Sequence, residues 1–303
     1  MILITGAYGL VGTALTKTLE AVPLNADIDL CNFYEVVGAF QALKPEVIIH
    51  CAAKVGGILG NLNQQGEFFY KNILINTNVL QAAYIANVKK VISFGSSCAY
   101  PENAPQPYKE IDLHNGEPYN AHFAYAYAKR MLSVQSKAYN EQYGFSNLCI
   151  IPSNIYGPND KFDLNCGHVM PSLLLKCLLA KRQNTDFTVW GTGAGRREFI
   201  FVNDVAIIIK KLLESNIDNN IHTINVTTGK DHKLEDVVNI IVEVMNFKGK
   251  VIYDTNKPDG QLKKQTSIDL LRSIIGNIEF TNIKDGIQIT SAWLEKNYPN
   301  VRT

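Results

Sequence analysis

The sequence lacks the features that would place the chain in a membrane or on a nucleic acid. No apolar run reaches the roughly 20 residues that a helix needs to cross a bilayer. The 303 residues carry 29 basic and 28 acidic side chains, so the formal net charge is only +1 and gives no attraction to polyanions. We therefore expect neither a membrane nor a nucleic acid as a partner.

Cysteine pairs at metal-binding spacing are also missing. The six cysteines include no C-x-x-C motif and no zinc-type spacing, so no metal site is expected. In a chain of this length they indicate reduced thiols rather than a disulfide framework. The first residues form a strand pattern and not the basic and apolar segments typical of a signal peptide. Together these features predict a cytoplasmic protein.

Short apolar runs alternate with longer amphipathic segments along the first half of the chain. Strands are predicted at residues 2–4, 47–50, 90–94 and 146–151, and helices at 10–21, 68–86 and 125–143. This alternation predicts an α/β fold with a Rossmann-type doubly wound parallel sheet that is covered by helices on both faces.

The alternation loosens after Tyr156, and no linker or repeat separates the two halves. Helices are predicted at residues 170–180, 205–213, 234–245 and 286–297, and strands at 223–226 and 251–253. We therefore expect a smaller substrate-binding lobe that is interleaved with the first domain. The dinucleotide-binding domain is placed at about residues 1–158 and 199–228, and the lobe at about residues 159–198 and 229–303.

Three glycines follow the first predicted strand and open the first predicted helix, at Gly6, Gly9 and Gly12. This spacing allows a tight turn and a close approach of the backbone to a pyrophosphate at a helix N-terminus. The alternative is a glycine-rich turn with no ligand, but the strand–turn–helix placement favours a dinucleotide. Leu10 and Val11, inside the loop, are predicted to contact the cofactor too.

An acidic residue after the second strand would bind the adenosine ribose of NAD. That strand is poorly marked, and Asp27 and Asp29 follow it in what resembles the start of a loop. We predict that the adenine lies against Asp29 and Leu30. This segment does not decide between NAD and NADP.

Tyr125 and Lys129 are four residues apart on a predicted helix, so their side chains share one face. A lysine cation near a phenol favours the phenolate and makes tyrosine a usable proton donor and acceptor. Ser96 directly follows the predicted strand at 90–94, at the sheet edge where ligands bind. It could hydrogen-bond a substrate carbonyl or simply cap the turn. The three residues together predict carbonyl reduction, in which hydride addition to carbon is matched by a proton on oxygen.

With these residues in place, the sequence resembles the extended short-chain dehydrogenases and, within them, the GDP-L-fucose synthase family. The resemblance rests on strings that occur in family order along nearly the whole chain. They are Ala52-Ala53-Lys54-Val55-Gly56-Gly57-Ile58, Gly95-Ser96-Ser97-Cys98-Ala99-Tyr100-Pro101, Asn154-Ile155-Tyr156-Gly157-Pro158-Asn159-Asp160, His168-Val169-Met170-Pro171, Trp190-Gly191-Thr192-Gly193, Arg197-Glu198-Phe199 and Lys257-Pro258-Asp259-Gly260. The resemblance implies NAD(P)H-dependent reduction at C4 of a GDP-linked 4-keto sugar, which can be accompanied by epimerisation at C3 and C5.

The resemblance also implies a role for each matched residue. Tyr125 would donate a proton to the C4 oxygen, Lys129 would hold the nicotinamide ribose, and Ser96 would orient the carbonyl. Cys98 and His168 would form the acid–base pair that inverts C3 and C5. Further cofactor contacts are implied for Ala52, Ala53, Asn154, Ile155 and His168, and substrate contacts for Ser97, Asn154, Lys176, Trp190, Arg197 and Lys264. The family further suggests a homodimer joined by the helices at 68–86 and 125–143, although the same apolar stripes would serve a monomer core.

Several positions depart from the family pattern. Tyr8 stands where family members often have an arginine for the 2′-phosphate of NADP, and Lys176 replaces another arginine. The resemblance therefore favours NADP(H), with NAD(H) left open. The segments 118–124 and 165–167, which would border the sugar, also differ. Three alternatives follow: a GDP-4-keto-heptose reductase with little or no epimerase activity, an epimerase or dehydratase that recycles a tightly bound NAD, and a non-catalytic dinucleotide sensor.

Overall fold

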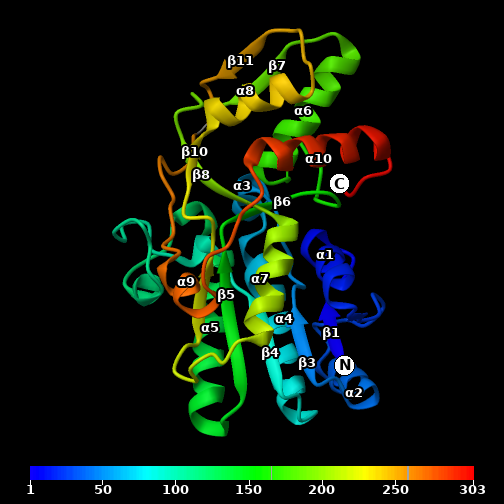
Figure 1. Ribbon diagram of the computed structural model, residues 1–303, viewed down its shortest axis with the longest axis vertical. Coiled ribbons are helices and arrows are strands. Elements are labelled where there is room, and N and C mark those ends of the chain that lie inside the picture. Colours follow the sequence, from blue (N-terminus) through cyan, green and yellow to red (C-terminus); the bar gives the residue numbers. More distant parts are fainter. Residues whose placement is uncertain (165, 258) are drawn as a thin grey trace.

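The computed structural model describes residues 1–164, 166–257 and 259–303; Asn165 and Pro258, which fall in segments quoted above, lie outside the described residues, as do the side chains of Ile58 and Leu59. Six parallel strands form the central sheet (Figure 1) in the order β2-β1-β3-β4-β5-β9. They are β1 (Ile2–Thr5), β2 (Val22–Pro23), β3 (Val47–His50), β4 (Lys90–Phe94), β5 (Ser146–Pro152) and β9 (Thr223–Val226). The predicted Rossmann-type α/β fold is confirmed.

The inner strands of this sheet are short and almost entirely buried, which is why the sequence marks them as apolar runs. The register places Ile4 beside Ile49 and Ile49 beside Ile92, so branched side chains form a continuous layer across three strands. Such a layer is typical of a parallel sheet that is covered on both faces. The edge strand β2 has only two residues, both exposed.

Helices cover both faces of the central sheet (Figure 1). One face packs against α1 (Leu10–Leu19), α7 (Val202–Glu214) and α9 (Asp269–Ile275). The other face packs against α2 (Phe33–Leu43), α4 (Gln65–Ile85) and α5 (Phe123–Tyr143). The sheet is therefore doubly wound, with its two apolar cores on opposite sides.

The helices predicted at 10–21, 68–86 and 125–143 are confirmed within a few residues. Helix α1 ends earlier than predicted because Glu20 takes a left-handed conformation with φ of 50°. Helix α5 ends at Tyr143, where Gly144 adopts the left-handed conformation that commonly terminates helices. Backbone conformation at these two positions sets boundaries that apolar periodicity does not reveal.

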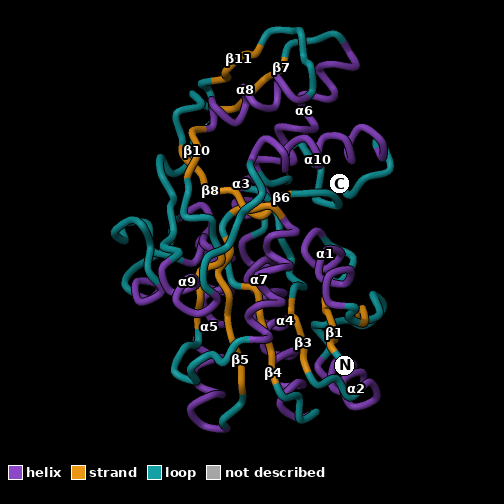
Figure 2. Tube along the Cα trace, in the orientation of Figure 1, coloured by secondary structure: helices purple, strands orange, loops and turns teal. Residues whose placement is uncertain are grey.

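A second group of elements lies beyond the carboxyl ends of the central strands, as the strand and helix colours of Figure 2 show. It contains a three-stranded sheet in the order β10-β8-β6 and a two-stranded sheet of β11 and β7. These strands are β6 (Asn154–Tyr156), β7 (Phe187–Trp190), β8 (Arg196–Phe201), β10 (Asp231–Lys233) and β11 (Val251–Asp254). The accompanying helices are α6 (Val169–Gln183), α8 (Leu234–Val244) and α10 (Ile283–Asn297).

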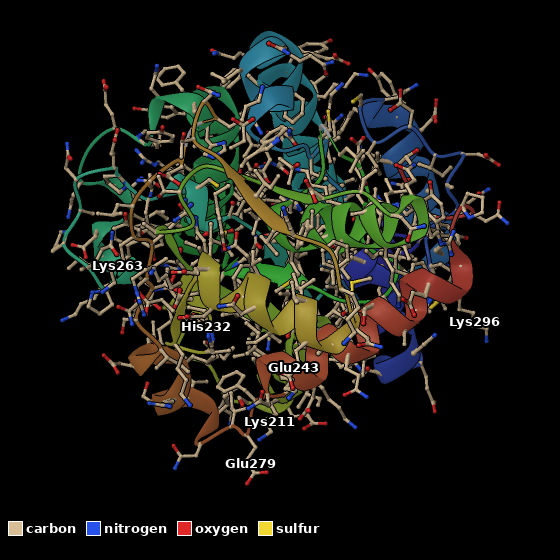
Figure 3. All side chains as sticks on the ribbon, turned by 90° about the horizontal axis from the view of Figure 1, so that it is seen from above. Lys211, His232, Glu243, Lys263, Glu279 and Lys296 are labelled. Carbon is tan, nitrogen blue, oxygen red and sulfur yellow. The ribbon has the colours of Figure 1, made fainter. Side chains whose placement is uncertain are left out.

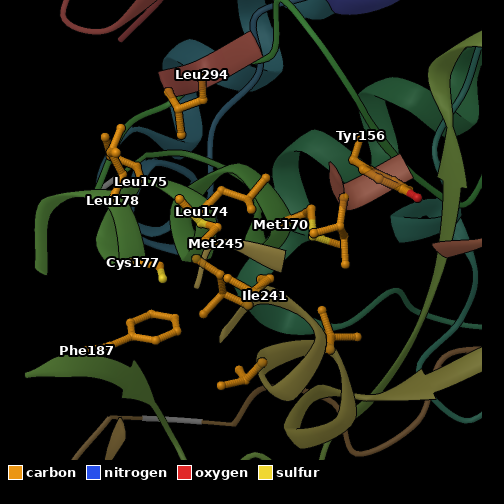
Figure 4. Packing of buried hydrophobic residues seen from close by; sticks show 14 of the residues in the cluster. Tyr156, Met170, Leu174, Leu175, Cys177, Leu178, Phe187, Ile241, Met245 and Leu294 are labelled. Carbon is orange, nitrogen blue, oxygen red and sulfur yellow. The ribbon is translucent and has the colours of Figure 1, made fainter. Parts of the chain in front are cut away.

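This second group has an apolar core of its own (Figure 4). Leu174 of α6, Phe187 of β7 and Ile241 of α8 are fully buried in it. Leu294 joins the same cluster from α10. Because the cluster draws on helices and strands from residues 156 to 301, the second group can hold its shape against the central sheet.

Short elements and loops connect the two groups. They include α3 (Ile58–Asn63) and the 3₁₀ turns η1 (Ser97–Ala99), η2 (Glu110–His114) and η3 (Asn120–His122). Figure 3 shows charged side chains such as Lys263, Glu279 and Lys296 at the rim of the molecule. Among the described helices, none combines the length and the apolar character that a membrane span requires.

Candidate active site

A cavity of about 560 Å³ lies between the carboxyl ends of the central strands and the second group of elements. Its lining includes the glycine loop, the segment after β4, the start of α5, β6 and α6. The structure brings to it every residue predicted for the site except Asp29 and Leu30. The predicted residues that line it are Gly6, Gly9, Leu10, Val11, Gly12, Ala52, Ala53, Ser96, Ser97, Cys98, Tyr125, Lys129, Asn154, Ile155, His168, Lys176, Trp190, Arg197 and Lys264.

Asp29 and Leu30 lie in the loop after β2 and do not line this cavity. A carboxylate oxygen of Asp29 accepts a hydrogen bond from the Cys31 amide at 2.9 Å. The Leu30 carbonyl accepts one from the Asn78 side chain of α4 at 3.0 Å. The second of these bonds ties the loop to α4. Neither bond tests a cofactor role for the two residues, which stays a prediction.

The glycine loop has the shape that a dinucleotide requires. A Cβ atom at Gly6, whose φ is +67°, would come within 2.7 Å of the Ala52 amide nitrogen. A Cβ at Gly12 would meet the Gly6 carbonyl and the backbone of Ala7. Gly9 is the N-cap of α1, and no side chain caps that helix start, so its first amides face the cavity mouth uncapped. Close backbone approach and free amides at a helix start fit the diphosphate of a nicotinamide dinucleotide.

Ser96 and Tyr125 approach the cavity from neighbouring elements. Ser96 follows β4 and Tyr125 lies in the first turn of α5, and both line the cavity. Burial raises the pKa of Tyr125 far above its usual range, the nearby charge of Cys98 raises it further, and the neighbouring Ser96 hydroxyl lowers it. The phenol therefore holds its proton at neutral pH and is suited to donate it.

Lys129 lies one helical turn after Tyr125 and is buried. Its ammonium donates a hydrogen bond to the Phe94 carbonyl at 2.7 Å, and burial lowers the pKa of Lys129 to about 8. The tuning of the Tyr125 pKa by Lys129 stays a prediction. Burial sets the direction of both shifts, because the tyrosine and the lysine are both removed from water.

Cys98 and His168 face the cavity from different elements. Cys98 lies in η1, and its sulfur accepts a hydrogen bond from the Lys264 ammonium at 3.3 Å. His168 is the N-cap of α6. Its ring is reachable from the cavity, yet desolvation by the surrounding protein, and then the charge of Lys161, lower its pKa. A thiol and a neutral imidazole in one cavity can remove and return protons.

Cationic side chains, Lys176 and Arg197 among them, also line the cavity. The Lys176 ammonium lies 4.2 Å from the centre of the Trp190 ring, and the Lys257 ammonium lies 5.6 Å from it. Arg197 donates a hydrogen bond to the Asp259 carbonyl at 3.3 Å, and burial lowers its pKa. Asn154 is fixed by a bond from its amide to the Glu198 carbonyl at 2.7 Å. Aromatic and cationic groups side by side suit a nucleotide diphosphate.

Many residues that line the cavity were not predicted for the site from the sequence, and two of them are His122 and Arg302. His122, in η3, lines the cavity, and its buried Nδ1 atom has no hydrogen-bond partner among the described residues. Burial, followed by the charges of Lys264 and His168, lowers the pKa of His122 to about 3. Arg302, near the end of the sequence, lines the cavity beside Gly9. The departure from the family pattern at residues 118–124 was the sequence signal that could have identified His122. No local motif marks Arg302.

The parallel sheet, the glycine loop and the Ser96–Tyr125–Lys129 set define a class of nicotinamide-dependent enzymes that act on carbonyl or hydroxyl carbons. The chain belongs to the NAD dependent epimerase/dehydratase family, whose model matches residues 2–227.

Within this family, the most informative relatives are full-length matches. The GDP-L-fucose synthase of Dictyostelium discoideum is 38% identical, covering 99% of this chain and 97% of that protein. The GDP-L-fucose synthase of Escherichia coli is 33% identical, covering 99% and 98%. The crystal structure of a GDP-L-fucose synthetase from Naegleria fowleri bound to NADP has a TM-score of 0.92 at 32% identity, covering 100% of this chain and 94% of that one. The resemblance found in the sequence strings is confirmed.

Proposed function

We propose that this protein uses NADPH to reduce the C4 keto group of a GDP-linked 4-keto sugar and epimerises the sugar at C3 and C5. The observation that carries this proposal is that Ser96, Tyr125 and buried Lys129 line one cavity together with Cys98 and His168. Full-length similarity to GDP-L-fucose synthases supports the GDP-sugar, and the NADP-bound relative supports the cofactor. A heptose reductase without epimerase activity and an NAD-recycling enzyme are therefore not favoured.

The reduction needs one hydride on carbon and one proton on oxygen. When bound, the reduced nicotinamide supplies the hydride to C4. Tyr125 gives its phenolic proton to the C4 oxygen as negative charge develops there, and Ser96 can hydrogen-bond the same oxygen. Lys129, held against the Phe94 carbonyl, lies where it can orient the nicotinamide ribose. The products are the secondary alcohol and a phenolate that is reprotonated from solvent.

Epimerisation uses the same ketone. The C4 carbonyl acidifies the C–H bonds at C3 and C5, so a base can remove a proton from one face and an acid can return one to the other. Cys98 and His168 enter the cavity from η1 and the start of α6, which fits a two-sided exchange. The Lys264 ammonium positions the Cys98 sulfur through their hydrogen bond.

We also propose the division of the chain expected from the sequence, with the cofactor held mainly by residues 1–158 and 199–228 and the nucleotide sugar held by the rest. The glycine loop on one side of the cavity and Lys176, Trp190 and Lys264 on the other support it. A homodimer is part of the same proposal. The six cysteines are all free thiols, which supports a cytoplasmic location.

The reduction is tested with Tyr125→Phe, which removes the proton donor and keeps the ring. We expect the rate of NADPH oxidation with a GDP-4-keto sugar to fall at least roughly a hundredfold, because general acid catalysis typically contributes that much. NADPH affinity, measured by fluorescence titration, should stay within about twofold of the parent. Parent-like turnover in this variant would remove Tyr125 from the mechanism.

The epimerisation has a separate readout in the same preparations. Cys98→Ala and His168→Ala should each slow the incorporation of solvent deuterium at C3 or C5 of the keto sugar, followed by NMR. Lys263→Ala is the control, since this exposed side chain next to Lys264 pairs with Asp231 at 4.0 Å. Unchanged deuterium incorporation in both active-site variants would leave a reductase without epimerase activity.

A further inference from the structure

The last residues of the sequence return to the cavity after α10 ends. The Phe162 amide donates a hydrogen bond to the Arg302 carbonyl at 2.8 Å, and Lys161 and Arg302 form a parallel bridge. Phe162 is fully buried and stacks on Trp293 of α10, with ring centres 5.8 Å apart. Figure 1 shows this end of the chain between α10 and α1. The backbone of Arg302 is therefore fixed by the second group of elements.

The side chain of Arg302 reaches the glycine loop. Its Nη1 atom donates a hydrogen bond to the Asn159 carbonyl at 3.3 Å. The same atom would lie 3.5 Å from a Cβ atom built on Gly9. Gly9 is the N-cap of α1, so the guanidinium stands in van der Waals range of the helix start. Arg302 and the three loop glycines line one cavity.

The Arg302 guanidinium and the positive N-terminal end of α1 thus lie close together without a full negative charge beside them. The start of a helix carries a partial positive charge, and the first turn of α1 contains no acidic residue. The Asp160 carboxyl, which feels the charge of Arg302, is 4% exposed and lines the cavity. One of its oxygens accepts from the Lys161 amide at 2.7 Å, and the other has no hydrogen-bond partner among the described residues. Burial raises the pKa of Asp160 to about 7 although the Lys161 amide and the Arg302 charge lower it, so its negative charge is incomplete at neutral pH.

We propose that Arg302 binds the diphosphate of the nicotinamide dinucleotide from the side opposite the α1 amides. This inference rests on the proposed cofactor site and adds a contact that arrives from the far end of the chain. A guanidinium can bind two phosphate oxygens at once, whereas the α1 amides bind through single N–H donors. Because the diphosphate is common to both cofactors, Arg302 serves NADH and NADPH alike.

The test compares Arg302→Ala and Arg302→Lys with Arg272→Ala, which removes an exposed arginine on α9. Dissociation constants for NADH and NADPH are measured by fluorescence titration at fixed salt, with the unfolding temperature of each cofactor-free protein as a folding check. We expect Arg302→Ala to weaken both cofactors by the same factor, roughly tenfold, as loss of a charge-assisted phosphate contact implies. Arg302→Lys should lose less, since it keeps the charge but not the fork. Arg272→Ala should bind like the parent.

Three outcomes would overturn the inference. Parent-like binding of both cofactors by Arg302→Ala would remove Arg302 from the site. Weakening of NADPH alone would place the arginine at the 2′-phosphate instead of the diphosphate. A parent protein that binds neither cofactor would contradict the proposed function itself, and this result is distinguishable because it appears before any variant is compared. Arg302→Lys keeps the test decisive if Arg302→Ala unfolds.

Discussion

Glu198 shows how a single buried carboxyl can hold the walls of the cavity together. It lies in β8 and is 2% exposed. One of its oxygens accepts hydrogen bonds from the Thr266 amide at 2.9 Å and from the Thr266 hydroxyl at 2.6 Å. Its main-chain carbonyl accepts the Asn154 bond described above. Burial raises the pKa of Glu198 to about 7, so the protonated and ionised forms of this carboxyl are both populated near neutral pH.

This raised pKa predicts the direction in which folding stability changes with pH. Between the ordinary glutamate value of 4.5 and about 7, the folded protein binds a proton that the unfolded chain has released. Stability from this group is therefore present below pH 4.5 and is lost as the pH rises through 7. Glu198→Gln removes the titration, so the parent should lose stability relative to the variant by up to about 1.4 kcal/mol per pH unit in this window.

Urea denaturation of both proteins between about pH 5 and pH 8 measures the difference. Glu214→Gln, on the exposed side of α7, is the control and should follow the parent curve. Parallel curves for Glu198→Gln and the parent would mean that Glu198 is ionised throughout this range.

At the scale of elements, the glycine loop and α1 depend on the absence of side chains. Gly12 has no room for a Cβ, which would collide with the Gly6 carbonyl and the Ala7 backbone. Gly38, in the middle of α2, has nothing within 4 Å of the same position. The two glycines therefore offer one substitution, to alanine, with opposite consequences.

We predict that Gly12→Ala forces the loop open, lowers the unfolding temperature and weakens NADPH binding by at least roughly tenfold. Gly38→Ala should raise stability by up to about 1 kcal/mol, because alanine is favoured over glycine inside a helix. Differential scanning fluorimetry and cofactor titration measure both effects. A Gly12→Ala protein that binds NADPH like the parent would show that the loop does not need this close contact.

The elements that the sequence predicts well are those with strong periodicity and buried faces, such as β3, β4 and α5. Helix α2 was missed although Asn32 caps it, its side chain accepting from the Tyr34 amide at 3.2 Å. The reason is that strand β2 before it has only two exposed residues, so no apolar pattern marks where the next helix could begin. The Asn32 cap can be recognised in the sequence only when the preceding strand has been located.

The candidate site divides in the same way. Ser96, Tyr125 and Lys129 were predicted because they lie at strand ends and helix starts that local patterns mark. The bond from Lys264 to Cys98 joins residues 166 positions apart, and the approach of Arg302 to Gly9 joins the two ends of the chain. Such contacts depend on how the second group of elements packs over the sheet, which no local spacing encodes.

At the scale of the whole molecule, α4 and α5 pack against each other and leave large apolar side chains on their outer surface. Phe69, Tyr70, Met131 and Val134 are each between 41% and 63% exposed. Met131 and Val134 are three residues apart on α5 and share one face. Exposed large apolar side chains on two long helices that pack together support the homodimer proposed above, in which a second copy would cover them.

We predict that replacing both Met131 and Val134 with glutamate converts the dimer to a monomer, because a symmetric interface would then bring four carboxylates together at an apolar contact. Light scattering coupled to size-exclusion chromatography measures the mass of parent and variant. Tyr34→Glu is the control, since it adds a carboxylate at an exposed aromatic position on α2. The control should remain a dimer. A monomeric parent would contradict the homodimer itself. A double variant that stays dimeric would place the interface away from Met131 and Val134, because two carboxylates per chain would not be tolerated at an apolar contact.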